Sequence, residues 1–366
     1  MHMALCFKTL AEDRKTKARV GKLRTAHGAI ETPFFMPVTT KGTAKQLSQE
    51  ELQKTKTETI ICNALLLSLR PGLDIIQNAG GLHDFIRWDK VIFTDSGGFQ
   101  MVSKNFLKKV TKNAIHFRSP YDQQEIVMTP ERAIMVENSL GADVAMTLDH
   151  VEHYLRDKKR IQEAMETTHR WAAQCIDAHT NKKQLLFGIT QGGTFADLRA
   201  ASAKAINGMD FDGVALGGLC LGESKEIMHR MVELSVPLLD EHKPRYLMGV
   251  GTPKDLVEAV ALGIDIFDSC FPTRTARHGL SFCAGKNIDI TKKQWSRDKS
   301  SLDKNCVCAV CKTFSKAYIH HLFRSHEFMG QRYVSYHNIA FIQQVVKEIR
   351  QAIREGTFAE YRKKYR

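Results

Sequence analysis

Short apolar runs rich in β-branched residues recur at wide spacing along this chain, and most are separated by segments with helical apolar spacing. Apolar runs without polar alternation are typical of strands buried on both faces, as in parallel sheets. Eight such runs occur, at residues 33–38, 59–62, 91–94, 143–148, 185–190, 213–217, 246–250 and 264–267. Eight strands alternating with helices predict a (β/α)8 barrel, and an open doubly wound sheet is the alternative.

The intervening segments carry helix boundary signals. Residues 129–141 begin with Thr129 as a predicted N-cap and Pro130 at the first helical position, and they end at Gly141. Residues 252–263 repeat the Thr-Pro start and the Gly stop, and residues 158–179 keep helical apolar spacing over several turns. We therefore expect helices over these three segments, packed against the sheet.

Polar residues follow several of the predicted strands. The strand ends carry Asp95, Asp149, Gln191 and Asp268, and a Gly217-Gly218 pair follows the sixth run. In a (β/α)8 barrel the catalytic groups sit at the carboxyl ends of the strands, so these side chains should share one mouth. Carboxylates there suit metal ligation, glycosidase chemistry, or an enzyme that cleaves a base from a ribose.

Three of the nine cysteines are clustered as Cys306, Cys308 and Cys311, and His337 follows 26 residues after the last. A Cys-x-Cys-x2-Cys run followed by a histidine suits a closed tetrahedral zinc site with a structural role. Three other histidines are competing fourth ligands: His320, His321 and His326.

The composition is that of an ordinary globular protein, with 366 residues, 43% of them hydrophobic and 25% charged. The formal net charge of +13 is typical of proteins that bind polyanions such as nucleic acids. The first residues lack a hydrophobic signal core, and no run approaches the roughly 18 apolar residues of a membrane helix. We expect a cytoplasmic protein.

Several motifs together closely resemble the tRNA-guanine transglycosylase (queuine tRNA-ribosyltransferase) family. They read TDSGGFQ (94–100), QGG (191–193), GGLCLGES (217–224), LMGVG (247–251) and FDSCFPTRTARHG (267–279), besides the cysteine–histidine set. The likeness extends to TAHGAIETPFFMPV (25–38) and RPGLDIIQNAGGLHDF (70–85), so it covers nearly the whole chain. The combination is specific, whereas no single motif would be.

The resemblance implies one transglycosylase barrel domain over residues 1–366, with a zinc-binding subdomain at about 283–345 that holds one structural Zn²⁺ per chain. It implies exchange of the wobble guanine in tRNAs for aspartate, asparagine, histidine and tyrosine, whose anticodons read GU(N). The incoming base would be queuine. It also implies a dimer, either a homodimer or a heterodimer with a family paralogue.

The resemblance also assigns roles to residues. Asp268 would be the nucleophile that attacks the ribose, giving a covalent aspartyl–ribose intermediate, and Asp95 would be the general acid/base and a base ligand. Arg274 and Arg277 would hold the anticodon uridines, and Cys306, Cys308, Cys311 and His337 would hold the zinc. The remaining substrate-binding residues implied are Ser96, Phe99, Asp149, Gln191, Gly217, Gly218, Leu219 and Met248.

The chain departs from the family pattern in two places that concern the site. Family members usually read CNTYHL where this chain reads CNALLL, so Ala64, Leu65 and Leu66 replace polar residues near the second strand end. Bacterial members usually place Glu-Cys after the pocket aspartate, whereas His150 and Val151 follow here. This second departure favours queuine, and the prequeuosine base (7-aminomethyl-7-deazaguanine) is the alternative substrate.

Two other classes of function remain open from the sequence. A non-catalytic, tRNA-binding partner subunit of the same family is one, although such partners tend to lose the nucleophile and Asp268 is present. A barrel hydrolase unrelated to RNA is the other, and it would leave the cysteine cluster and the basic charge unexplained.

Overall fold

The computed structural model describes residues 6–98 and 106–365. Its centre is an eight-stranded parallel sheet whose neighbours follow the order of the chain, and the predicted strands are confirmed. A parallel bridge between Val38 and Ile61 joins the first strand to the second, which excludes the open sheet. The barrel strands are β4 (Phe34–Pro37), β5 (Thr59–Asn63), β6 (Val91–Asp95), β10 (Val144–Met146), β11 (Leu185–Thr190), β12 (Gly213–Leu216), β13 (Arg245–Leu247) and β14 (Ile266–Ser269).

Alternate strand residues fill the barrel interior, because successive side chains of a strand point to opposite faces. Phe93 is fully buried at the centre and packs edge-on against Phe34, Phe187 and Tyr246, with ring centroids 5.8–6.3 Å apart. The interior is therefore a packed core, and any reaction centre must lie above it, at one end of the barrel.

The expected helix signals operate as predicted. Helix α6 (Pro130–Leu140) is capped by the Thr129 hydroxyl, which accepts a hydrogen bond from the Arg132 backbone N–H, and it ends at Gly141 in the left-handed conformation. Helix α10 (Pro253–Ala261) has the same start at Thr252, and α7 covers Lys158–Ala178. The other helices around the barrel are α1 (Gln49–Lys54), α2 (Ala64–Leu67), α3 (Leu73–Asn78), α4 (Leu82–Ile86), α8 (Ala196–Asn207) and α9 (Lys225–Ser235).

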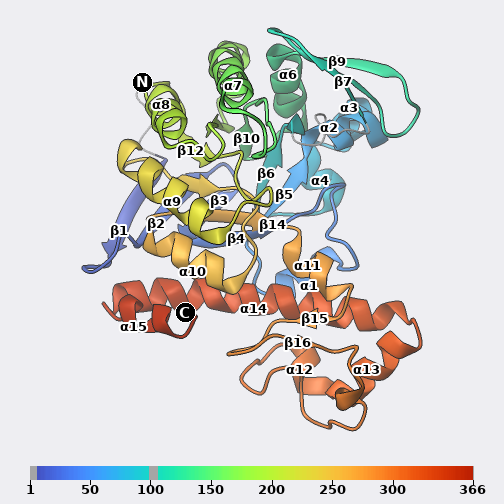
Figure 1. Cartoon of the computed structure of the whole chain (residues 1–366). Helices are drawn as coiled ribbons and strands as arrows, with labels where there is room; N and C mark the ends of the chain where they lie inside the picture. Colours follow the sequence, from blue (N-terminus) through green and yellow to red (C-terminus); the bar gives the residue numbers. More distant parts are fainter. Residues whose placement is uncertain (1–5, 99–105, 366) are drawn as a thin grey trace.

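Two three-stranded antiparallel sheets, besides the short β15–β16 pair described below, were not predicted from the sequence. Strands β1 (Phe7–Glu12), β2 (Arg19–Thr25) and β3 (Gly28–Thr32) form one, and β7 (Leu107–Val110), β8 (Ile115–Arg118) and β9 (Glu125–Met128) form the other. Phe7, Leu23 and Ile30 of the first sheet pack into the same apolar cluster as the barrel interior. This sheet therefore closes one end of the barrel, while the second lies between β6 and α6 in the chain (Figure 1).

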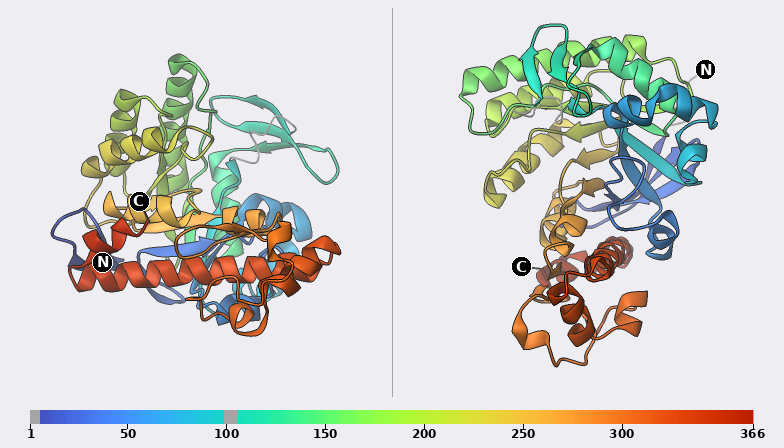
Figure 2. Two further views of the ribbon diagram at one scale, coloured as in Figure 1. Left: turned by 60° about the horizontal axis from the view of Figure 1, so that its bottom comes forward. Right: turned by 90° about the vertical axis from the view of Figure 1, so that its right-hand side faces the viewer.

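The C-terminal part of the chain is built on one long helix, α14 (Phe328–Arg354), which runs beside the barrel and is followed by α15 (Phe358–Lys363). Helix α11 (Phe271–Ala276) follows β14 and contacts α14. The segment with β15 (Leu280–Ser281), β16 (Ile288–Asp289), α12 (Ala309–Thr313) and α13 (Lys316–Arg324) lies on the side of α14 away from the barrel (Figures 1 and 2). Across the described residues no helix is both long and apolar enough to cross a membrane.

Candidate active site and metal cluster

Strand alternation brings the predicted polar residues to one end of the barrel. Ile61, Phe93, Ile189, Tyr246 and Ile266 all belong to the interior cluster. The residue two positions after each must face the same way, above the core, at the carboxyl end of its strand. Those residues are Asn63, Asp95, Gln191, Met248 and Asp268. The shared mouth expected from the sequence is therefore present.

Asp95 is the last residue of β6, rather than a loop residue after it. Its Oδ1 accepts two hydrogen bonds of 2.7 Å, from the Asn63 side-chain amide and from the Gly97 backbone N–H. Burial, together with the nearby carboxylates of Asp268 and Asp149, nevertheless raises the pKa of Asp95 to about 7, outweighing the hydrogen bonds from Gly97 and Asn63. A carboxyl group of this kind can both give and take a proton near neutral pH.

Asp268 lies within β14, where its Oδ1 accepts hydrogen bonds from the Tyr246 hydroxyl at 2.6 Å and from the Gly249 backbone N–H at 2.9 Å. Burial raises the pKa of Asp268, and these two donors oppose that rise by stabilising the carboxylate. Both donors bind the same oxygen, and within residues 6–98 and 106–365 no donor to Oδ2 is found. The arrangement suits a carboxylate that attacks through its second oxygen.

Asp149 and Gln191 form a polar pair beside these acids. The Gln191 side-chain amide donates to Asp149 Oδ2 at 2.7 Å, and burial raises the pKa of Asp149 to about 6. Gly218 has a φ of +65°, and a β-carbon there would lie 2.3 Å from the Gln191 Oε1. Gly98 is equally restricted, because its β-carbon would lie 2.6 Å from Asp149 Oδ1. Only glycine therefore lets the backbone approach this pair.

The other predicted site residues have varied positions. Ser96 is buried, with its hydroxyl donating to the Thr147 carbonyl at 3.2 Å, Leu219 is buried after β12, and Met248 is half-buried after β13. Phe99 lies outside the described residues. On α11, which directly follows the Asp268 strand, Arg274 is exposed, and the half-buried Arg277 at its C-terminal end donates to the Thr273 carbonyl.

Sequence reasoning missed three residues that support the site. Asn63 caps α2 by accepting from the Leu66 N–H and also donates to Asp95, so one polar side chain remains at the altered CNALLL stretch. Tyr246 was read only as a strand residue. The Glu223 carboxylate accepts the backbone N–H groups of Cys220 and Leu221, which fixes the loop after β12. The sequence signal that pointed to Tyr246 was its position in the strand, two residues before Met248 and therefore on the same, interior-facing side.

The clustered cysteines and His337 come together between α12 and α14. Metal-ligating atoms of Cys306, Cys308, Cys311 and His337 all lie within 4.8 Å of one another, and His337 Nδ1 is 3.2 Å from the Cys311 sulfur. His337 Nε2 donates to the Phe282 carbonyl at 2.7 Å, which leaves Nδ1 free of its proton for a metal. These four residues could hold a metal ion. His320 instead bonds the Ile290 carbonyl through its Nδ1.

Fold and site together define a (β/α)8-barrel protein with three carboxylates at the carboxyl end of its strands, of which Asp149 is buried and Asp95 and Asp268 are half-buried, and a separate Cys3His cluster. A family model described as queuine tRNA-ribosyltransferase matches residues 13–366. The chain belongs to this family.

Curated relatives named queuine tRNA-ribosyltransferase are similar to this chain over almost their whole length. The one from Symbiobacterium thermophilum is 46% identical over 364 residues, covering 99% of this chain and 91% of the relative. The Halothermothrix orenii protein is 44% identical over 363 residues, covering 99% and 97%. The Bacillus subtilis protein is 42% identical over 360 residues, covering 98% and 94%.

Proposed function

We propose that this protein is a tRNA-guanine transglycosylase that exchanges the wobble guanine of tRNAs with GU(N) anticodons for queuine. The observation that carries the proposal is a pair of carboxylates at the mouth of a barrel from this family. Asp268 accepts a hydrogen bond from the Tyr246 hydroxyl, and Asp95 accepts one from the Asn63 amide. The net charge of +13 suits a tRNA partner.

In the first step an oxygen of Asp268 forms a bond to the ribose anomeric carbon, and the bond from that carbon to guanine N9 breaks with its electron pair leaving on guanine. The Tyr246 hydroxyl and the Gly249 N–H favour the ionised form of the nucleophile and orient it. Asp95, protonated in part because its pKa is about 7, gives its proton to the departing base. The product is a covalent aspartyl–ribose ester on the tRNA.

In the second step Asp95, now ionised, takes the proton from N9 of the incoming base. That nitrogen attacks the anomeric carbon, and Asp268 leaves as a carboxylate. One displacement is thus divided into two, each inverting the anomeric centre, and no nucleotide triphosphate is needed. The raised pKa of Asp95 allows one group to serve as acid and then as base.

The purine would be held by Asp149 and Gln191, with the backbone of Gly217, Gly218 and Leu219. The N1–H and amino group of guanine match a carboxylate acceptor, and a backbone N–H matches its carbonyl oxygen. Ser96 would complete this pocket, and Phe99 and Met248 would lie against the two faces of the base. Arg274 and Arg277, on the helix after the Asp268 strand, would contact the anticodon uridines.

We assign Zn²⁺ to the Cys3His cluster, because three thiolates and one imidazole are a donor set typical of structural zinc. Residues of about 283–345 would form the zinc-binding subdomain of a single domain over residues 1–366. Zinc there would join α12 to α14 and take no part in the exchange. A dimer, homomeric or with a paralogue, and a cytoplasmic location complete the proposal.

Queuine is the base we favour over the prequeuosine base. Val151, two residues after Asp149, is 9% exposed and apolar. An apolar group there suits the cyclopentene ring of queuine, whereas the aminomethyl cation of the prequeuosine base would lose hydration beside it. A pocket difference of this size discriminates by about 1–3 kcal/mol. Competition between the two bases for guanine-loaded tRNA should therefore show a preference for queuine. A tenfold advantage for the prequeuosine base would exclude queuine as the preferred substrate.

The test of the reaction is incorporation of labelled guanine into unmodified tRNA. Asp268→Asn should lose this exchange by several orders of magnitude while still binding tRNA, because the nucleophile is gone and the shape is kept. Normal turnover by Asp268→Asn would exclude the mechanism. A wild-type protein that binds tRNA but exchanges no base would instead be the non-catalytic partner subunit.

A further inference from the structure

A fully buried arginine lies beside the turns that carry the predicted base-binding residues. Arg199 is on α8, and its side chain is buried although it carries a charge. Burial lowers the pKa of Arg199 to about 10, so the guanidinium is still protonated at neutral pH. A buried cation is costly unless an opposite charge pairs with it, so the charge of Arg199 calls for a physical reason.

The guanidinium contacts the two turns of the mouth that follow β11 and β12. Its Nε donates to the Gly193 carbonyl at 2.7 Å. A β-carbon on Gly218 would lie 3.4 Å from its Nη2 and 2.3 Å from the Gln191 Oε1, so both side chains border Gly218. Ser202, three residues further along α8 and therefore on the same face, accepts the Gln191 backbone N–H at 2.9 Å. One face of α8 thus supports both turns.

The charge of Arg199 has no direct counter-ion within residues 6–98 and 106–365. Nη1 and Nη2 are buried there without a hydrogen-bond partner, and no ion pair involves this guanidinium. The Glu223 carboxylate acts on Arg199 from nearby, but its two oxygens accept the backbone N–H groups of Cys220 and Leu221. The protein therefore places a positive charge beside the base pocket without a carboxylate bonded to it.

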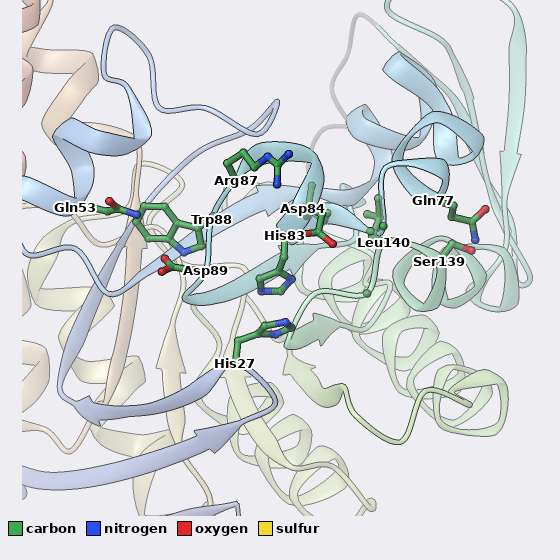
Figure 3. A pocket seen from close by; sticks show the side chains of 14 residues that line it. His27, Gln53, Gln77, His83, Asp84, Arg87, Trp88, Asp89, Ser139 and Leu140 are labelled. Atoms are coloured by element: carbon green, nitrogen blue, oxygen red, sulfur yellow. The ribbon is translucent and has the colours of Figure 1, made fainter.

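The titratable groups at the amino-terminal end of β10 differ, because they satisfy one another. His27 and His83 stack with ring centroids 3.6 Å apart, and each lies 3.0 Å from a different oxygen of Asp143. The two rings lie side by side and adjoin a cavity of about 740 Å³ (Figure 3). Asp143 directly precedes β10, so the packed barrel interior separates this group from the mouth. Its carboxylate has partners within the protein, whereas the terminal nitrogens of Arg199 do not.

We propose that Arg199 is a positioning residue for base exchange, and that its buried positive charge stabilises the negative charge on the departing guanine. The inference rests on the proposed function. When the bond between the ribose and N9 breaks, its electron pair stays on the purine until Asp95 gives a proton to the base. Conjugation spreads this charge to the carbonyl oxygen, on the edge that the backbone around Gly218 would hold. A fixed charge at a site shielded from water acts strongly and needs no reorganisation during the reaction.

Steady-state exchange of labelled guanine into tRNA tests this role with two variants. Arg199→Gln keeps an amide donor for the Gly193 carbonyl but removes the charge, whereas Arg199→Lys keeps the charge. Arg199→Gln should lower kcat about tenfold to a hundredfold and leave KM for tRNA and guanine unchanged, because the interaction is made only as charge develops. Arg199→Lys should recover most of this loss. A residue that only shaped the pocket would instead raise KM, and lysine would not rescue kcat.

The matched control is Arg245→Gln. Arg245 is also buried, and burial lowers its pKa to about 10, but it begins β13 at the end of the strand away from the mouth. This variant should keep the wild-type kcat even if its Tm falls.

The proposal is overturned if Arg199→Gln keeps the wild-type kcat, if it raises KM instead, or if Arg199→Lys exchanges base no faster than Arg199→Gln. Failure of both variants to fold, measured by Tm, would make Arg199 a structural residue only and would overturn it too. These results would leave the proposed function standing. A wild type that exchanges no base would overturn the proposed function together with this inference.

Discussion

Tyr246→Phe should move the acid limb of the pH–rate profile for base exchange to higher pH. Tyr246 is fully buried in the barrel interior, and its hydroxyl donates a 2.6 Å hydrogen bond to Asp268 Oδ1. Phenylalanine keeps the ring and its packing against Phe93, so the substitution removes little besides this donor. Among the residues that the structure describes, the donor that remains to the carboxylate is the Gly249 N–H.

The size of the shift follows from the charge on the acceptor. A hydrogen bond to a charged group contributes about 1.5–3 kcal/mol, and 1.36 kcal/mol corresponds to one pKa unit. Because the lost donor stabilised the ionised form of Asp268, its removal raises the pKa of Asp268 further. Below the new pKa the nucleophile is protonated in most molecules. The rate there should fall about tenfold to a hundredfold relative to the wild type, and the difference should shrink as pH rises.

The assay is kcat/KM for labelled guanine exchange into tRNA between pH 5 and 9. Tyr361→Phe is the matched control, because the Tyr361 hydroxyl donates to the Glu348 carboxylate at 3.0 Å in the C-terminal helices, away from the mouth. The control should keep the wild-type profile even if its Tm falls. An acid limb at the same pH in Tyr246→Phe would refute the assignment of Tyr246 as a positioning residue for the nucleophile.

Three further predictions concern stability, metal and RNA. Asp95→Asn should abolish exchange, yet it should raise Tm more at pH 8 than at pH 5. The raised pKa of Asp95 in the folded protein contributes stability at low pH that is lost as pH rises through about 7. Asparagine never ionises, so the variant does not lose this stability. Equal Tm changes at both pH values would contradict this. Cys308→Ser should release zinc and lower the stability of the C-terminal part, as shown by metal analysis and proteolysis, whereas full zinc content would remove Cys308 from the ligand set. Arg274→Ala and Arg277→Ala should reduce discrimination between GU(N) and other anticodons, and an equal loss on all tRNAs would mean that they only neutralise phosphate.

The barrel was predictable from the sequence because its strands are buried on both faces and read as continuous apolar runs. Helix boundaries such as Thr129 and Gly141 were equally clear, since caps act through residues close in sequence. The grouping of Asp95, Asp149, Gln191 and Asp268 followed from the barrel rule that strand ends share one mouth. The Cys-x-Cys-x2-Cys spacing indicated the metal cluster for the same local reason.

Only the tertiary structure decided which side chains support these residues. The strands of the two three-stranded antiparallel sheets are short and partly exposed, so their pattern was weak. Tyr246 reaches Asp268 across neighbouring strands, and its hydrogen bond depends on strand register that a linear pattern does not contain. His27, His83 and Asp143 are up to 116 positions apart and meet only because the β2–β3 turn packs against the amino-terminal end of the barrel. Contacts between distant segments arise from packing of the whole chain. Local sequence signals therefore predicted the helices, the strands and the shared mouth, but they predicted neither the contact between Tyr246 and Asp268 nor the contacts of His27 and His83 with Asp143.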